Sequence, residues 1–389
     1  MNDVMAKQSR NLSMDVAKAM VICLIVLGHS FSEDSTSKIR SFLYLFHVPF
    51  FFIVSGYFFN EKYIHKPIEL IFRRIKSLWV PFFSWAIPFI IFHNFFFAIY
   101  VYSSQVTFRG HSIPHYSILA MAKNIAMLFL FKASEQLLGA FWFLQCLFFS
   151  VAIFLTLSWL LNKVSLSRLL PLFTVALFVA GNAMFSFNIH FPFVPYDVRL
   201  FFVATFLYHI GFLYRKYEKS IPVRFLPMLV SLLILLAINA ADFVKIDSIY
   251  SVTGLSYKSV LYLVATPILG TYVVIYVSQY ISRFSISKYF NFIGNQTIAI
   301  LALHFLCFKL VSLLIVHKDN LPLYKIAEFP VIANDGWWFL AYSAVGIAVP
   351  IMVYIPFLKS KEFAINAFLK LINRGACRAF QNIMRFGRH

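Results

Sequence analysis

The sequence predicts an all-α, polytopic integral membrane protein with about ten transmembrane helices and both termini in the cytoplasm. Its composition, 61% hydrophobic and only 13% charged over 389 residues, is far from that of a soluble domain. Apolar stretches of about 20 residues, the length that crosses the hydrocarbon core, recur along most of the chain. The 34 Lys and Arg residues gather mainly in the short loops between these stretches.

About ten stretches have the length and hydropathy of membrane spans. In chain order they are residues 14–31, 41–59, 78–100, 138–161, 166–185, 197–214, 221–241, 258–281, 292–316 and 336–358. A further apolar stretch, 117–131, is short and carries Lys123, so we expect it to lie along the membrane interface. The predicted membrane-embedded domain therefore covers residues 1–358.

The remaining residues, 359–389, are predicted to form a basic, amphipathic cytoplasmic tail. Four apolar side chains of this segment fall near one helical face: Phe363, Phe368, Leu369 and Ile372. Such a helix suits an anionic lipid surface, and a solvated, disordered tail is the alternative.

The distribution of cationic residues sets the predicted topology. With the N-terminus inside, about two thirds of the Lys and Arg residues fall in cytoplasmic segments, as the positive-inside rule requires. The net charge of +19 is therefore a property of membrane loops, so we expect membrane lipids and no nucleic acid as partners. We expect a multi-pass protein of the inner (cytoplasmic) membrane, and the sequence leaves a homo-oligomer open.

The first predicted span carries a polar stripe. Lys18 and His29 are eleven residues apart, which on a helix returns to within about 20° and rises about 16 Å. Asp15, three residues before Lys18, falls on the same face. Polar residues within a span usually face a protein interior or a wet cavity and indicate a functional path.

His29 is the candidate general base, because an imidazole that titrates near neutrality suits removal of a proton from a hydroxyl group. Topology places other polar or amphipathic side chains near its depth: His47 on the second span, with Trp142 and Gln145 on the fourth. Both His47 and His304, which lies within a later span, could contact a substrate or serve packing alone. Trp142 could equally be an interfacial anchor.

A basic cluster, Arg73, Arg74 and Lys76, precedes the third predicted span on the cytoplasmic side. Guanidinium and ammonium groups suit phosphates, although a run of this kind is by default a topology signal. The four cysteines lie far apart without ligand-like spacing, so we predict no metal.

Several of these stretches together resemble the acyltransferase 3 family of integral membrane O-acyltransferases, most closely its fucose 4-O-acetylase-like branch. The matching pieces begin with Met14 to Lys18 and Val26 to Ser30, continue with Phe46 to Phe52 and Ser55 to Tyr57, and include Arg73 to Lys76 before Pro81. Later pieces are Phe141 to Leu144, Asn295 to Thr297 and His304. Two departures stand out, because much of the family has Arg where this chain has Lys18 and Lys76.

The resemblance implies transfer of an acyl group, usually from acetyl-CoA, to a sugar hydroxyl of an envelope polysaccharide or its lipid-linked precursor. Arg73, Arg74, Lys76 and Lys18 would then bind the acyl donor, and His29 would act on the acceptor hydroxyl. His47, Trp142, Gln145 and His304 would shape the acceptor pocket, with Asp15 and Ser55 in supporting positions. Direct transfer and a covalent acyl-histidine intermediate are both compatible with these residues.

Three alternatives remain at this level. The donor could be succinyl-CoA or another short acyl-CoA, and the acceptor could be a lipid or peptidoglycan. A non-enzymatic transporter of a lipid-linked sugar would also need a polar path through the helices.

Overall fold

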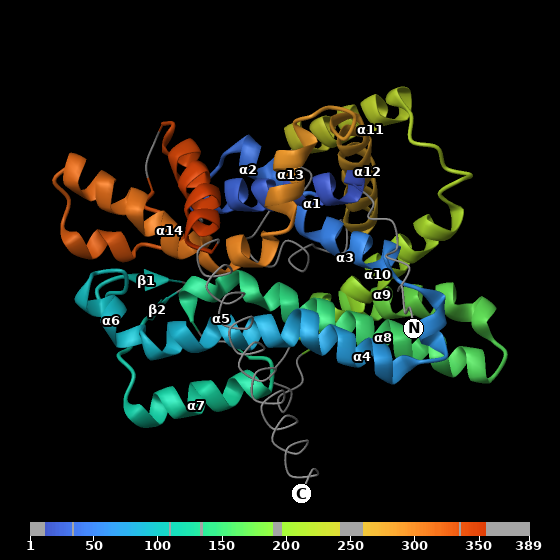
Figure 1. The fold of residues 1–389 in the computed structure, drawn as a ribbon, viewed down its shortest axis with the longest axis horizontal. Coiled ribbons are helices and arrows are strands. Elements are labelled where there is room, and N and C mark those ends of the chain that lie inside the picture. The colour runs from blue at the N-terminus through green and yellow to red at the C-terminus, as the bar shows by residue number, and fades with distance from the viewer. Residues whose placement is uncertain are drawn as a thin grey trace, which may run out of the picture.

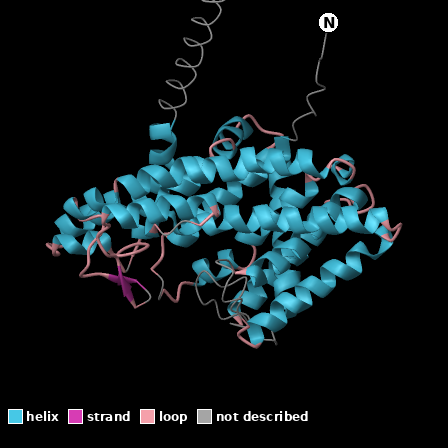
Figure 2. Ribbon diagram, turned by 90° about the horizontal axis from the view of Figure 1, so that it is seen from below, coloured by secondary structure: helices cyan, strands magenta, loops and turns pink. Residues whose placement is uncertain are grey.

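The computed structural model of the chain describes residues 12–32, 35–108, 110–132, 135–189, 197–241, 260–333 and 336–354. Apart from a two-stranded antiparallel sheet, regular structure in these ranges is helical. Several of the long helices run in a similar direction, and the small sheet lies at one end of the molecule (Figures 1 and 2). The predicted tail, 359–389, lies outside the described residues.

Up to Lys163 the elements are, in chain order, α1 (Leu12–His29), α2 (Lys38–Tyr44), α3 (His47–Tyr57), η1 (Glu61–Ile64), α4 (Pro67–Arg74), η2 (Ile75–Trp79), α5 (Val80–Ile91), α6 (His93–Ala98), β1 (Thr107–Phe108), β2 (His111–Ser112), α7 (Ile118–Phe129), η3 (Gln136–Phe141) and α8 (Trp142–Lys163). The elements that follow are η4 (Ser167–Leu169), α9 (Leu170–Ser186), α10 (Val198–Tyr217), α11 (Phe225–Ala240), α12 (Val260–Ile281), α13 (Ser287–Gly294), α14 (Thr297–Lys318), η7 (Leu323–Ala327) and a further helix, Trp338–Tyr354.

The prediction of an all-α, polytopic membrane protein is confirmed. Six helical segments among the described residues are long and apolar enough to span a membrane: Leu12–His29, Lys38–Tyr57, Gln136–Lys163, Ser167–Ser186, Tyr262–Ile281 and Thr297–Lys318. The predicted span 197–214 corresponds to α10. The stretches 221–241 and 336–358 correspond to the shorter apolar helices α11 and Trp338–Tyr354.

The third predicted span has different bounds from those expected. Helical structure begins at Pro67, continues through the π-helical turn η2, and ends at Ile91, where Phe92 separates α5 from α6. Proline suits the first turn of a helix because its missing N–H has no intrahelical acceptor there. The helix therefore starts eleven residues earlier than the predicted span, and the basic cluster belongs to the helix itself.

Helix α7 packs lengthwise on α5 instead of lying across its end. The side-chain amide of Asn94 donates to the Tyr116 carbonyl and accepts from the Tyr116 N–H next to the start of α7, whereas Phe129 at its end contacts Trp79 and Phe83. The two helices therefore run antiparallel side by side (Figure 1). The interfacial position of 117–131 stays a prediction, and aromatic contacts with α5 hold this short helix alongside its neighbour.

Helices α3 and α10 are in direct backbone contact. A Cβ atom on Gly56 would lie 1.8 Å from the carbonyl oxygen of Tyr208, and one on Gly211 would lie 1.7 Å from that of Ile53. Only glycine permits this approach, which is typical of closely packed membrane helices. The contact fixes α3, one wall of the site described below, against the centre of the bundle.

A buried polar clasp fastens the loop after α6 to the segment before η3. Glu135 accepts hydrogen bonds from His93 Nδ1 at 3.1 Å and from the Tyr102 hydroxyl at 2.9 Å, while His93 Nε2 donates to the Pro114 carbonyl at 2.9 Å. Burial, together with the neighbouring Glu135 carboxylate, raises the pKa of Tyr102 well above its usual value. The phenol therefore remains protonated and serves as a donor.

Candidate functional site

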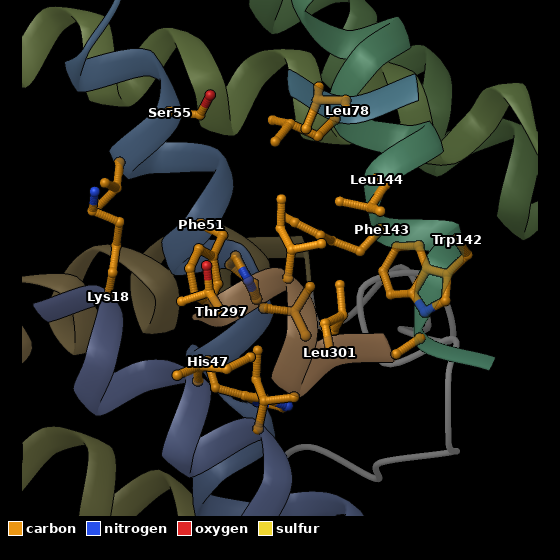
Figure 3. A pocket seen from close by; sticks show the side chains of 18 of the residues that line it. Lys18, His47, Phe51, Ser55, Leu78, Trp142, Phe143, Leu144, Thr297 and Leu301 are labelled. Carbon is orange, nitrogen blue, oxygen red and sulfur yellow. The ribbon is translucent and has the colours of Figure 1, made fainter. Parts of the chain in front are cut away.

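One cavity of about 270 Å³ lies among α1, α3, α8 and α14, and its walls are mainly apolar. Lys18 and His29 both line it, so the cavity extends along about 16 Å of α1. Figure 3 shows Lys18 and Ser55 on one side of the cavity and Trp142 on another, with Leu301 contributed by α14. Lys18 and His29, which the sequence predicts to share one face of the first helix, thus line a single cavity.

An ion pair holds the side chain of Lys18 in place at one end of the cavity. Lys18 Nζ lies 2.8 Å from Asp15 Oδ1 and 5.3 Å from the centre of the Phe58 ring. Asp15 is buried and does not line the cavity, whereas Ser55 of α3 does. Asp15 therefore orients Lys18, and the ammonium group is the part that a ligand can reach.

The structure separates the three members of the basic cluster. Arg74 lines the cavity, and its Nε atom is buried without a hydrogen-bond partner. Arg73 is exposed and pairs with Glu69 at 3.0 Å, while Lys76 is exposed in η2, and neither lines the cavity. Successive helical residues point about 100° apart, so one helix cannot direct all three side chains into the same hollow.

His29 lies at the other end, at the last residue of α1. The ring also lines a second, smaller cavity of about 40 Å³, and Arg40, Phe108 and Phe329 contribute to the walls of that cavity. Tyr44 and Trp142 also line both cavities. His29 therefore stands in a partition that the two cavities share, and a group in either cavity can reach it.

Tyr44 is the orienting partner of His29. Its hydroxyl lies 3.4 Å from His29 Nδ1, a long hydrogen bond whose direction depends on the tautomer. When Nδ1–H donates to this oxygen, Nε2 carries the lone pair that a general base requires. Gly28 permits the contact, because a Cβ atom there would lie 3.1 Å from Tyr44 Cε2. Glu33 follows His29 by four residues in the sequence and could also orient it, and Glu33 lies outside the described residues.

His47 lines the larger cavity and packs against Tyr44, with ring centres 4.6 Å apart. Its Nδ1–H donates to the Leu43 carbonyl at 2.6 Å, so its Nε2 is an acceptor in the neutral ring. The arrangement of a basic end, a long apolar channel and an imidazole end suits a thin acyl carrier whose charged part stays at the mouth.

The model of the acyltransferase 3 family, described as an acyltransferase domain, matches residues 11–355. The chain belongs to the acyltransferase 3 family. It is a multi-pass membrane acyltransferase, and the matched range includes the walls of both cavities. Comparison with curated proteins and with solved structures gives no match. Among the described residues, no group of three or more His, Cys, Asp or Glu side chains could hold a metal ion.

Two residues predicted for the acceptor pocket of this acyltransferase lie elsewhere. Gln145 does not line either cavity, and its Nε2 donates to the Phe131 carbonyl at 2.7 Å, which holds the chain after α7. His304 is fully buried behind His29, with ring centres 5.5 Å apart and an angle of 29°. Its Nδ1 is 3.0 Å from two backbone carbonyls of α14, and its Nε2 has no hydrogen-bond partner. His304 therefore supports the ring of His29, and Gln145 fixes the segment that follows α7.

Arg40 is the residue that sequence reasoning missed at the acyltransferase site. In the predicted topology Arg40 falls in the loop between the spans 14–31 and 41–59, but only 6% of its surface is exposed. Its guanidinium lies over the Tyr44 ring, 4.9 Å from the centre, and lines the smaller cavity. The spacing Arg40, Tyr44, His47 follows the three- and four-residue period of a helix and could have indicated a shared face.

Proposed function

We propose that this acyltransferase moves an acetyl group from cytoplasmic acetyl-CoA to a sugar hydroxyl of a cell-envelope polysaccharide or its lipid-linked precursor, in the inner membrane. One observation carries the proposal: a single cavity is lined by Lys18 and Arg74 toward one end and by His29 at the other. A charged donor held at the mouth can thereby present its thioester deep within the protein.

The donor half of the proposal rests on the chemistry of coenzyme A. Its phosphates are too strongly hydrated to enter an apolar channel, and they suit the guanidinium of Arg74 at the mouth. Arg73 and Lys76 add positive charge nearby without reaching the cavity. The thin pantetheine arm would pass Lys18 and run between apolar side chains of α1, α3 and α14.

The chemical step follows from the position of His29. His29 Nε2 takes the proton of the acceptor hydroxyl, whose oxygen attacks the thioester carbonyl carbon. A new ester C–O bond forms, the C–S bond breaks, and the sulfur of coenzyme A leaves and receives a proton. Tyr44 holds the ring in the required tautomer, while His47 and Trp142 contact the reacting groups from the cavity walls.

The decisive test compares the surface glycans of cells with and without this gene by mass spectrometry. We expect the glycan of expressing cells to carry additional acetyl groups, which alkaline treatment removes because they are esters. A gain equal to a succinyl group would change the donor to succinyl-CoA, the alternative among short acyl donors. Identical glycans in both strains would contradict the proposed acceptor.

Donor affinity should depend on Arg74 far more than on Lys76. Arg74→Gln removes a cavity-lining guanidinium and should raise the KM for acetyl-CoA about tenfold, because a charge-assisted hydrogen bond to phosphate is lost. Lys76→Gln is the matched control, since this exposed ammonium does not line the cavity. Steady-state release of free thiol, measured in membrane vesicles, checks both variants. Equal effects would mean that the cluster attracts the donor only through its overall charge.

A further inference from the structure

Two arginines are buried among the residues that the structure describes, and their surroundings differ. Arg199, 7% exposed, forms two hydrogen bonds of 2.8 Å with the Asp197 carboxylate. Arg40, 6% exposed, has no carboxylate partner within the described part of the chain, and its Nε atom is buried without a hydrogen-bond partner. Arg40 thus presents a charge for which the described protein supplies only the face of Tyr44.

A buried guanidinium without a counter-ion is unfavourable, because desolvation of a charge is not offset by contact with one aromatic face. Such a group is expected where a ligand supplies the missing charge. The smaller cavity lies directly beside Arg40, and the ring of His29 forms another part of its wall. Its volume of about 40 Å³ has room for about three water-sized groups, which is the scale of one anionic group and not of a sugar ring.

We propose that Arg40 binds an anionic oxygen group of the acceptor, a carboxylate or a phosphate, in the smaller cavity beside His29. This inference rests on the proposed function and narrows its acceptor to negatively charged saccharides. The planar fork of the guanidinium matches the paired oxygens of either group. An acceptor held in this way would have a neighbouring hydroxyl near His29, since both residues line the same small hollow.

The acceptor side is favoured over the donor side by the position of Arg40. It lines the smaller cavity and not the larger one, in which Lys18 and Arg74 already supply positive charge. Arg40 lies in the first turn of α2, at the same end of the site as His29, which is the last residue of α1. An anionic acceptor therefore reaches His29 through the smaller cavity, and the proposed donor reaches it through the larger one.

The first measurement tests anion binding without any reaction. Full-length protein is saturated with coenzyme A, and its melting temperature is compared in inorganic phosphate, in glucuronate and in sodium chloride of equal ionic strength. We expect phosphate or glucuronate to stabilise the wild type and not Arg40→Gln, because ligand binding to the folded state raises stability. Arg199→Gln, which breaks a paired arginine, should melt lower and retain the anion effect. An equal shift in Arg40→Gln, or none in the wild type with either anion, would overturn the inference.

The second measurement identifies whether the anionic group of the acceptor is a carboxylate or a phosphate. Acetyl transfer from acetyl-CoA is assayed with glucuronate, glucose 1-phosphate and neutral methyl glucoside as acceptors. We expect one charged acceptor to be preferred, and Arg40→Gln to raise its KM about tenfold while changing the KM for methyl glucoside little. A preference for glucuronate assigns a carboxylate, and a preference for glucose 1-phosphate assigns a phosphate.

The two failures are distinguishable. Transfer that is equal for charged and neutral acceptors and unaffected by Arg40→Gln would remove the anion site and leave the proposed function intact. Transfer to none of these acceptors, combined with an Arg40-dependent stabilisation by phosphate or glucuronate, would support the anion site and remove these saccharides from the proposed function.

Discussion

Replacing His29 with alanine should abolish acyl transfer while the protein still accumulates in the membrane. A positioned general base contributes about 10²- to 10⁴-fold to rate, and His29 is the histidine that lines both cavities. We therefore expect the rate of thiol release in the presence of acceptor to fall by at least about hundredfold. Membrane level, measured by immunoblot, should stay close to that of the wild type.

His209 provides the matched control for this experiment. It is also a buried histidine in a helix, but it bonds to Thr174 at 2.6 Å and does not line either cavity. His209→Ala should reduce stability without changing the chemical step, so its kcat should remain near the wild-type value. Activity that survives in His29→Ala would remove the catalytic assignment, because neither His47 nor His304 lines both cavities.

Filling the Lys18 end of the larger cavity should be nearly as damaging as losing the base. Ser55 of α3 lines this end, so Ser55→Phe would place an aromatic ring where the arm of the donor is proposed to pass. A thioester that stops short of His29 loses the close positioning on which the reaction depends. We expect kcat to fall about hundredfold.

Ser55→Ala is the matched control, because it distinguishes the effect of a larger side chain from the effect of losing the hydroxyl. It removes the hydroxyl and adds no volume, so transfer should continue at a rate close to that of the wild type. Both variants are measured by thiol release in vesicles, with membrane level as the control for folding. Full activity in Ser55→Phe would show that the donor does not use this cavity.

The polar stripe of α1 could be predicted because it lies within one helix. The period of the helix alone determines that Lys18 and His29 share a face, and the structure places both on one cavity. The wider features of an all-α membrane protein followed equally directly from hydropathy and span length. These properties depend on one segment at a time, so they can be predicted from the sequence alone.

Properties that depend on contacts between segments could not be predicted from the sequence. The depths expected for Gln145 and His304 did not reveal which way their helices are rotated, and both side chains face away from the cavities. Arg74 lines the larger cavity and Lys76 does not, because the two residues lie two positions apart in helical structure that begins at Pro67 and includes a π turn. Arg40 and Tyr44 meet His29 only because α2 folds back beside the end of α1.

The partition between the two cavities has a consequence for the membrane as a whole. A continuous water-filled path through a membrane protein lets ions leak down their gradient, and two cavities that merge would lengthen such a path. The rings of His29, Tyr44 and Trp142, which border both hollows, stand where such a leak would open. The side chains proposed to surround the reacting atoms therefore also limit how far water can extend through the interior of the protein.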